Sequence, residues 1–359
     1  MEIVILGGAG AIGSNLARYF NDRDHRVIVF DNLTRYGVHN NLPPFRRRGI
    51  EFIHGDIRNT EDFLRIPCAY KGAIRAVINC AAQPTAVDGY RYPRFDYTNN
   101  THGVFNSLEY VRHNADCLVF FSTNKVYSAD VVNAPMRIVQ GDRQVWATSG
   151  TPSLEGFNQH YGFSEQLTLS GGEKCIYGAT KAASDILVRE YCDAFKIPHV
   201  ANRYSCLAGP WQWGKPEQGW AAWWVIAAEL GLPIEYIGHE GRQVRDVLFT
   251  DDVCRLIDAQ INTILHDRHT WGAYTIGGSH KHTLSLREAT ALVEKMTGKK
   301  MQVSYTSEPR VADHIVYISD IRKAVSTFGW EPTLDIHTGY QQIYKWVMDN
   351  IDVLKGIYK

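Results

Sequence analysis

Tyr177 and Lys181 are a pair of residues whose types and spacing could do chemistry. They stand four residues apart in the stretch 175–195, whose apolar residues recur at helical spacing, so both side chains share one helix face. On that face the lysine ammonium can lower the pKa of the phenol from about 10 by stabilising the phenolate. A phenol tuned in this way can act as a general base near neutral pH. An ordinary amphipathic helix is the alternative interpretation.

Hydroxyl groups follow an apolar run in the sequence FFSTNKVY, residues 120–127. The run is typical of a buried strand and ends at Ser122 and Thr123, directly before Asn124 and Lys125. The hydroxyl of Thr123 can hydrogen-bond a reacting group, but no carboxylic acid follows it. The stretch therefore predicts a chemistry that needs a hydroxyl without a neighbouring acid.

A glycine-rich loop comes directly after the first apolar run of the chain. Its glycines at 7, 8, 10 and 13 satisfy both G-x-G-x-x-G and G-x-x-G-x-x-G, and residues 14–20 continue with helical periodicity. Such glycines allow a tight turn and the close approach of a pyrophosphate to amides at a helix N-terminus. The loop predicts a dinucleotide site, with a purely structural turn as the alternative.

Asp31 ends the second apolar run, 18 residues after Gly13. An acidic side chain there can accept hydrogen bonds from the adenosine ribose, and its charge repels a 2′-phosphate, which favours NAD over NADP. Arg35 lies close enough in sequence to affect that choice. Asp56 and Ile57 follow the third run and are expected to meet the adenine, unless they form only a turn.

Short strand-like runs alternate with helix-like segments over the first half of the chain, at residues 2–6, 26–30, 51–54, 76–79 and 117–121. This alternation predicts an α/β fold, a doubly wound parallel sheet of the Rossmann type. After residue 203 the sequence becomes rich in Gly, Pro and Trp, which indicates a smaller C-terminal lobe over 204–359. Strand-like residues 244–249 and 273–278 are expected to return to the first lobe.

Composition excludes several classes of protein. The 359 residues are 45% hydrophobic and carry 38 basic and 38 acidic side chains, so nothing predicts nucleic-acid binding. The start resembles no signal peptide, and the apolar stretch 220–234 contains Glu229 and is shorter than the roughly 20 residues of a membrane helix. We therefore expect a cytoplasmic protein. Seven scattered cysteines and one close histidine pair, His280 and His282, predict no metal site.

The chain resembles the extended short-chain dehydrogenase/reductase family, which acts on nucleotide sugars. The resemblance rests on the glycine loop, Asp31, FFSTNKVY and the Tyr-x-x-x-Lys pair. The resemblance covers nearly the whole chain and implies an NAD-binding domain at 1–203 and a nucleotide-sugar-binding lobe at 204–359. It implies that Thr123 hydrogen-bonds the reacting hydroxyl, that Tyr177 is the catalytic base, and that Lys181 also holds the nicotinamide ribose.

The resemblance also implies the remaining site residues. Those expected to bind NAD are Gly7, Gly10, Ala11, Ile12, Gly13, Asp31, Asn32, Asp56, Ile57, Ala81, Asn100, Tyr177, Lys181 and Tyr204. Those expected to bind the substrate are Thr123, Asn124, Gln218, Trp220, Arg245 and Arg310, the two arginines through the diphosphate. A buried ion pair with Asp246 or Asp313 is the alternative for the arginines.

The residues after Thr123 indicate which reaction is expected. Dehydratases of the resembled family carry an acid and a base there, whereas this chain has Asn124 and Lys125. The segments STNKVY, GFSEQ, QGWAAWW and RQVRDVLFTDDV resemble epimerases that invert carbon 2 of a CDP-hexose. We expect an NAD-dependent nucleotide-sugar epimerase that forms a transient ketone, favours a CDP-sugar, and assembles as a homodimer or homotetramer. Lys125 is either a wall of its pocket or a surface charge.

Two alternatives stay open at this point. The first is a 4-epimerase or dehydrogenase of the same family, and the second is a catalytically silent NAD-binding protein. The substrate half departs further from the family than the cofactor half, since Trp211 stands where relatives commonly have Arg. Trp211, Trp213 and Trp220 could offer flat surfaces to a base or sugar, or could pack in the core.

Overall fold

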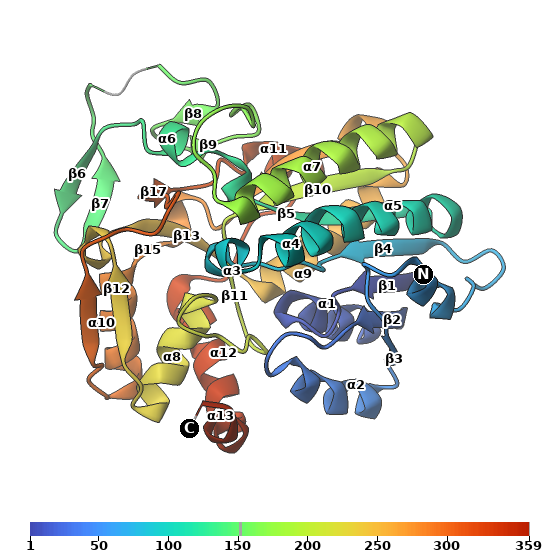
Figure 1. Cartoon of the computed structure of the whole chain (residues 1–359), viewed down its shortest axis with the longest axis horizontal. Helices are drawn as coiled ribbons and strands as arrows, with labels where there is room; N and C mark the ends of the chain where they lie inside the picture. The colour runs from blue at the N-terminus through green and yellow to red at the C-terminus, as the bar shows by residue number, and fades with distance from the viewer. Residues whose placement is uncertain (151–152, 359) are drawn as a thin grey trace.

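The computed structural model describes residues 1–150 and 153–358. A central sheet of seven strands, all parallel, forms the larger lobe (Figure 1). In spatial order the strands are β14 (Gly272–Ile276), β10 (His199–Tyr204), β5 (Cys117–Thr123), β4 (Arg75–Asn79), β1 (Glu2–Leu6), β2 (Arg26–Asp31) and β3 (Glu51–His54). The doubly wound parallel sheet predicted from the sequence is confirmed.

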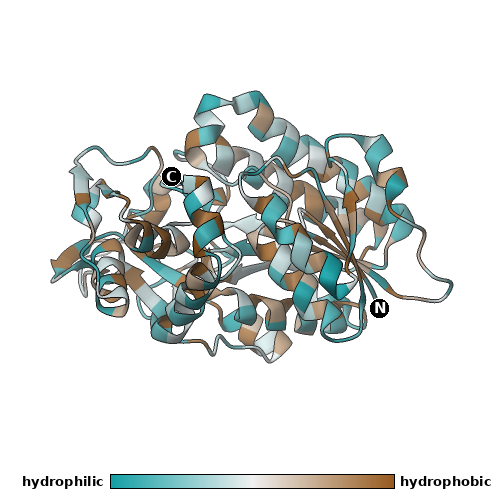
Figure 2. Ribbon diagram, turned by 90° about the horizontal axis from the view of Figure 1, so that it is seen from below, coloured by the Kyte–Doolittle hydropathy of each residue, from teal (hydrophilic) through white to brown (hydrophobic). Residues whose placement is uncertain are grey.

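Helices cover both faces of this sheet because its central strands are apolar on both sides. In β1, Ile3 and Ile5 join the core under one helix layer, and Val4 and Leu6 join the core under the other. The first layer contains α1 (Ala11–Asn21), α2 (Leu42–Arg48) and α9 (Thr250–Ile264), and the second contains α5 (Gly103–Asn114) and α7 (Ile176–Phe195). Figure 2 shows the hydrophobic strands enclosed between these helices.

The second lobe is built around a four-stranded sheet. It consists of β11 (Cys206–Ala208), β13 (Val244–Phe249), β15 (Thr283–Ser285) and β17 (Val316–Tyr317). Two small sheets extend the lobe: β12 (Ile234–Ile237) with β16 (Val303–Thr306), and β6 (Arg137–Gln140) with β7 (Arg143–Trp146). Its larger helices are α8 (Trp220–Leu230), α10 (Leu286–Thr297), α12 (Ile336–Asp349) and α13 (Ile351–Tyr358).

Smaller elements complete the description. They are α3 (Ala86–Arg91), α4 (Pro93–Tyr97), α6 (Ala129–Val132), α11 (Arg322–Phe328), β8 (Phe157–Asn158) and β9 (Gly162–Phe163). Within the described ranges, none of the helices is long and apolar enough to cross a membrane.

The two strands expected to return to the first lobe have different positions. β14 pairs with β10 at the edge of the central sheet. β13 instead pairs with β11, β15 and β17, which corrects the expectation for residues 244–249. The physical reason is that β13 buries residues such as Val244 against Val316, inside the second lobe. The division at residue 203 stays a prediction, and Trp146 and Phe163, which precede it, pack in the same cluster.

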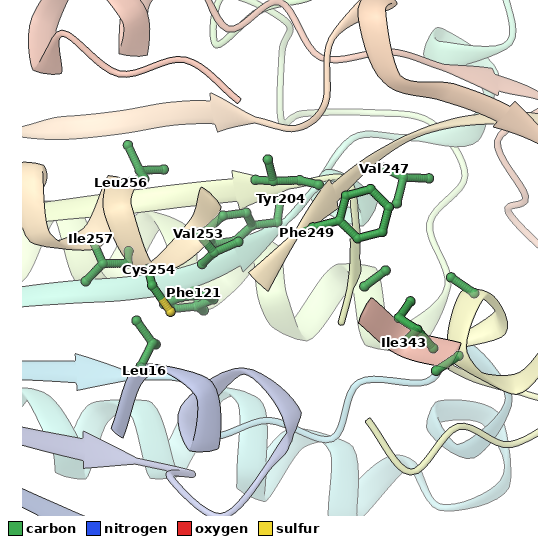
Figure 3. Close-up of a cluster of buried hydrophobic side chains, with 14 of the residues drawn as sticks. Leu16, Phe121, Tyr204, Val247, Phe249, Val253, Cys254, Leu256, Ile257 and Ile343 are labelled. Carbon is green, nitrogen blue, oxygen red and sulfur yellow. The ribbon is translucent and has the colours of Figure 1, made fainter. Parts of the chain in front are cut away.

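One hydrophobic core runs through both lobes. Figure 3 shows Tyr204 of the central sheet close to Phe249 of β13, with Phe121 beside Cys254 of α9 and Ile343 of α12 further along the same cluster. The ring centroids of Phe121 and Tyr204 lie 4.6 Å apart in a stacked arrangement. Because packed interiors resist deformation, this shared core fixes the position of one lobe against the other.

Candidate active site

A cavity of about 710 Å³ lies between the lobes. It opens at the carboxyl ends of the parallel strands, where open α/β sheets bind their ligands. The predicted site residues that line it are Gly7, Gly10, Ala11, Ile12, Gly13, Asp31, Asn32, Ile57, Ala81, Thr123, Asn124, Tyr177, Lys181, Tyr204, Gln218, Trp220, Arg245 and Arg310. Two predicted residues, Asp56 and Asn100, do not line it.

The glycine loop turns directly from β1 into α1. The backbone N–H groups of Gly7 and Gly8 both donate to the carbonyl of Phe30, at 2.8 and 3.3 Å, and Gly7 has a positive φ of 72°. A Cβ atom at Gly13 would lie 2.5 Å from the Cα of Gly8, so no side chain fits there. Gly10 is the N-cap of α1 and faces the cavity. The first-turn amides and the helix dipole therefore favour an anion at this point.

Asp31 is held at the end of β2 by backbone amides. Its carboxylate accepts from the N–H of Ala9 at 3.0 Å and from the N–H of Leu33 at 2.7 Å. Burial raises the pKa of Asp31, and these two amides oppose that rise because they stabilise the charged form. The carboxylate is thus fixed in the wall of the cavity, next to the glycine loop.

Asp56 and Asn100 support the wall from behind. Asp56 accepts from Asn32 at 2.9 Å and pairs with Arg58 at 2.6 Å; burial acts to raise its pKa, but these bonds outweigh burial and lower it. Asn100 is fully buried and exchanges two hydrogen bonds with the backbone of Gln83, at 2.8 and 3.0 Å. Each positions a residue that does line the cavity, Asn32 or Gln83.

Thr123, Tyr177 and Lys181 meet in the same cavity from two elements. Thr123 is the last residue of β5, and its hydroxyl oxygen accepts from the N–H of Lys125 at 3.3 Å. Tyr177 and Lys181 lie in the first turns of α7, which packs against β5. Lys181 is almost fully buried, and its ammonium donates to the carbonyl of Phe121 at 2.6 Å. The structure therefore agrees with the prediction that Tyr177 and Lys181 lie on one helix, and it places both residues at the cavity.

The pKa of Tyr177 differs from the expectation. Burial raises the pKa of Tyr177, and the opposing groups are the hydroxyl of Thr123 and the guanidinium of Arg35. Burial also lowers the pKa of Lys181 to about 8, against the pull of Asp185. The expected lowering of the tyrosine pKa is thus absent from this structure, because burial disfavours the phenolate more than the Thr123 hydroxyl and the Arg35 guanidinium favour it.

Arg245 and Arg310 reach the cavity in different ways. Arg245 pairs with Asp313 at 2.9 Å, as the ion-pair alternative expected, and it also lines the cavity, so its contact with a diphosphate stays a prediction. Asp246 instead accepts from the backbone amides of Ser279 and Ser319. Arg310 donates to the carbonyls of Pro216 and Glu217, at 3.3 and 3.4 Å, which leaves its charge available to a ligand.

The segment 211–219 lies at the junction of the lobes, and several residues in it line the cavity. Trp213 is 5% exposed and donates to Asn41 at 3.1 Å, and the carbonyl of Gly214 accepts from Tyr358 of α13. Lys215 lies 3.4 Å from Asp88 on α3. Of the three tryptophans considered from the sequence, Trp213 and Trp220 line the cavity, whereas Trp211 packs under the guanidinium of Arg18 at 3.8 Å.

Sequence reasoning missed several cavity residues. They include Gln83, Lys215 and Glu217, and Asp313, which the sequence suggested only as an ion-pair partner. Gln83 could have been found, because it follows the buried strand β4 at the ligand-binding edge. No pattern in the sequence indicates Lys215 or Glu217, since their loop has no periodicity. Over residues 1–150 and 153–358, no group of three His, Cys, Asp or Glu side chains could hold a metal ion.

The residues of the larger lobe fit NAD. The cradle at Gly10 and the α1 N-terminus suit a pyrophosphate, and Asp31 offers a carboxylate to a ribose. A Cβ atom at Gly10 would meet only the carbonyl of Gly7, at 3.2 Å, so a side chain there would occupy cavity space that the glycine leaves open.

Comparison with known proteins agrees with this geometry. Residues 3–277 match the model of the NAD dependent epimerase/dehydratase family. CDP-paratose 2-epimerase from Salmonella typhi is 31% identical over 96% of this chain and 99% of that protein. A putative UDP-glucose 4-epimerase from Methanocaldococcus jannaschii is 26% identical over 97% of this chain and 99% of the relative.

Solved structures show the same fold. UDP-glucose 4-epimerase from Bifidobacterium longum, solved with NAD+ and UDP, has a TM-score of 0.79 at 20% identity, covering 98% of this chain and 99% of that one. The dTDP-glucose 4,6-dehydratase from Bacillus anthracis, solved with NAD, has a TM-score of 0.75 at 25% identity over 99% of both chains. The family resemblance predicted from the sequence is confirmed. The chain therefore belongs to the NAD dependent epimerase/dehydratase family and is an enzyme that uses NAD.

Proposed function

We propose that the enzyme inverts carbon 2 of a CDP-hexose through a transient ketone. One observation carries the proposal: Thr123, Tyr177 and Lys181 line one cavity, while the two residues after Thr123 are Asn124 and Lys125. Neither of these can serve as the carboxylic acid or carboxylate that elimination of water needs. The 31% identity to a CDP-paratose 2-epimerase supports the same choice of carbon and nucleotide.

Side chains of the enzyme itself would transfer the proton. Tyr177 removes the proton of the hydroxyl on the reacting carbon, and the hydroxyl of Thr123 holds that oxygen by a hydrogen bond. Bound NAD supplies the hydride acceptor and, as NADH, the hydride donor. Tyr177 then returns the proton to the oxygen after the ketone has turned its other face, so that the configuration inverts. Lys181 contributes its positive charge next to the tyrosine and is expected to bind the nicotinamide ribose.

The charge of the substrate half suits a diphosphate. Three cations, Lys125, Arg245 and Arg310, act on the carboxylate of Asp313 and line the cavity with it. These four side chains carry three positive charges and one negative charge, which leaves a net charge of about two positive. A diphosphate, with about two negative charges, would neutralise them, and guanidinium groups bind phosphate oxygens well.

A 4-epimerase is the second candidate, because relatives at 26% and 24% identity carry the names putative UDP-glucose 4-epimerase and UDP-glucuronate 4-epimerase. Net accumulation of NADH during turnover would indicate a dehydrogenase and not either epimerase.

The experiment is incubation of CDP-, UDP-, GDP- and dTDP-hexoses with the enzyme in deuterated water. The expected product is the carbon 2 epimer of a CDP-hexose, with no deuterium at the inverted carbon, because the same hydride returns. Inversion at carbon 4 would favour the second candidate. A product lighter by one water, or deuterium at the inverted carbon, would exclude the hydride-return mechanism.

The homodimer or homotetramer and the cytoplasmic location stay predictions. Light scattering of the purified enzyme measures the first, and fractionation of the source cells measures the second.

A further inference from the structure

Lys125 has a place in the cavity that its position in the sequence does not explain. Its side chain is 22% exposed and lines the cavity, so it is not the surface charge that the sequence left open. Its ammonium donates to the carbonyl of Ala312 at 3.0 Å and lies 3.5 Å from Asp313. An ammonium has three donors, so these two contacts leave a third for a ligand in the cavity.

The two ends of Lys125 join different parts of the site. Its backbone lies against the first turn of α7, where a Cβ atom at Gly178 would be 2.4 Å from the Lys125 carbonyl oxygen. Gly178 follows Tyr177 directly, so this end lies beside the proposed base. The ammonium lies at Asp313, on the same Oδ1 atom that Arg245 contacts at 2.9 Å. The side chain thus runs along the wall from the reacting centre to the proposed diphosphate site.

The position of the diphosphate on a nucleotide sugar indicates what this arrangement of Lys125 could bind. The diphosphate is attached to carbon 1 of the hexose, next to carbon 2 and across the ring from carbon 4. If carbon 2 reacts at Thr123 and Tyr177, the phosphate on carbon 1 lies close to the reacting centre. A cation that adjoins both the base and the arginine cluster is placed for that phosphate, whereas a reacting carbon 4 would leave the ring between them.

We propose that Lys125 is a specificity-determining residue that binds the phosphate on carbon 1 and thereby places carbon 2 at Thr123 and Tyr177. Asp313 and the Ala312 carbonyl hold the ammonium in place, since an anchored side chain orients a ligand better than a free one. The inference rests on the proposed function.

The first test is titration of CDP into the NAD-loaded enzyme by calorimetry. Lys125→Met keeps the length of the side chain and removes its charge, so we expect its Kd for CDP to rise about 10-fold or more, the usual effect of losing a charge-assisted hydrogen bond. Lys125→Arg should restore part of the affinity. The NAD content and the melting temperature of both variants should match those of the wild type.

Lys299→Met is the matched control, because Lys299 loses an ion pair with Glu229 at 2.6 Å but does not line the cavity. This control should bind CDP as the wild type does. If Lys125→Met also kept the CDP affinity of the wild type, the phosphate contact would be excluded. If the wild type bound none of CDP, UDP, GDP and dTDP, the proposed substrate class would fail and the inference with it.

The second test locates the oxidised carbon. Quenching turnover with sodium borodeuteride reduces the transient ketone and labels the carbon that carried it. We expect the label at carbon 2 in the wild type and a share of it at other carbons in Lys125→Met. Lost CDP affinity with the label still confined to carbon 2 would refute the specificity role. A wild-type label at carbon 4 would instead refute the proposed inversion at carbon 2, and with it the inference.

Discussion

The cavity has a cofactor wall, which contains the glycine loop and Asp31, and a substrate wall, which contains Lys125, Arg245, Arg310 and Asp313. The two walls are built in different ways. In the cofactor wall, Asp31 is held by amides from the neighbouring glycine loop and from two residues further along its own strand end. In the substrate wall, Arg245 is held by Asp313, 68 residues away in the sequence. The first arrangement follows from local backbone geometry, whereas the second needs the whole second lobe to be folded. Changes in the two walls should therefore have separable effects, on NAD binding and on substrate binding.

Tyr177→Phe should have the largest effect, because this residue lies where the walls meet. We expect turnover to fall by at least about 10²-fold, since a positioned acid-base group supplies an effect of that order. NAD content and CDP affinity should be preserved, because only a hydroxyl is removed. Steady-state kinetics and the NAD released on denaturation measure this. Tyr161→Phe, which alters a 45% exposed tyrosine, is the control. Near-normal turnover in Tyr177→Phe would remove the proposed base.

Asp31→Ala should act on the cofactor wall alone. We expect NAD affinity to fall about 10- to 100-fold, the effect of losing hydrogen bonds from a ribose to a charged group, while NADP affinity falls less. Titration of both cofactors into cofactor-stripped protein measures the difference. An equal loss for NAD and NADP, or a changed CDP affinity, would contradict the separation of the walls.

The pH dependence of kcat/KM tests the roles of Tyr177 and Lys181, which lie where the two walls meet, without any substitution. Burial raises the pKa of Tyr177, so its base form is scarce at neutral pH and increases up to about tenfold per pH unit. Burial lowers the pKa of Lys181 to about 8, so its positive charge is lost above that pH. We expect activity to rise from about pH 6 and to level off or decline above about pH 8. Activity that is constant over this range would contradict a base of raised pKa.

Asp313→Asn should have the smallest effect and should act on the substrate wall alone. The variant keeps the shape of the side chain but weakens the anchor of Lys125 and Arg245. We expect KM for the nucleotide sugar to rise about 5-fold, the effect of roughly 1 kcal/mol for a partly exposed ion pair. Asp313→Glu should recover part of the loss. An unchanged KM with lower NAD content would show that the walls are coupled.

Much of the fold and of the cofactor wall could be predicted because the signals are local. The alternation of apolar runs predicted the parallel sheet, and β14 joins it, but β13 does not. The strand-like pattern of residues 244–249 cannot indicate which sheet will accept them. Burial against Val316 and pairing with three strands of the second lobe decided that position.

The sequence by itself determined the glycine loop, Asp31 and the Tyr177–Lys181 pair, because the signal for each lies within a short segment of the chain, a glycine turn, a strand end or one helix. Only the tertiary structure decided that burial raises the pKa of Tyr177, since burial depends on how the lobes pack. It also decided that Lys125 and Arg245 share one oxygen of Asp313. That contact joins a strand end of one lobe to a loop and a strand of the other, and side chains so far apart in sequence meet only when a common core fixes both lobes.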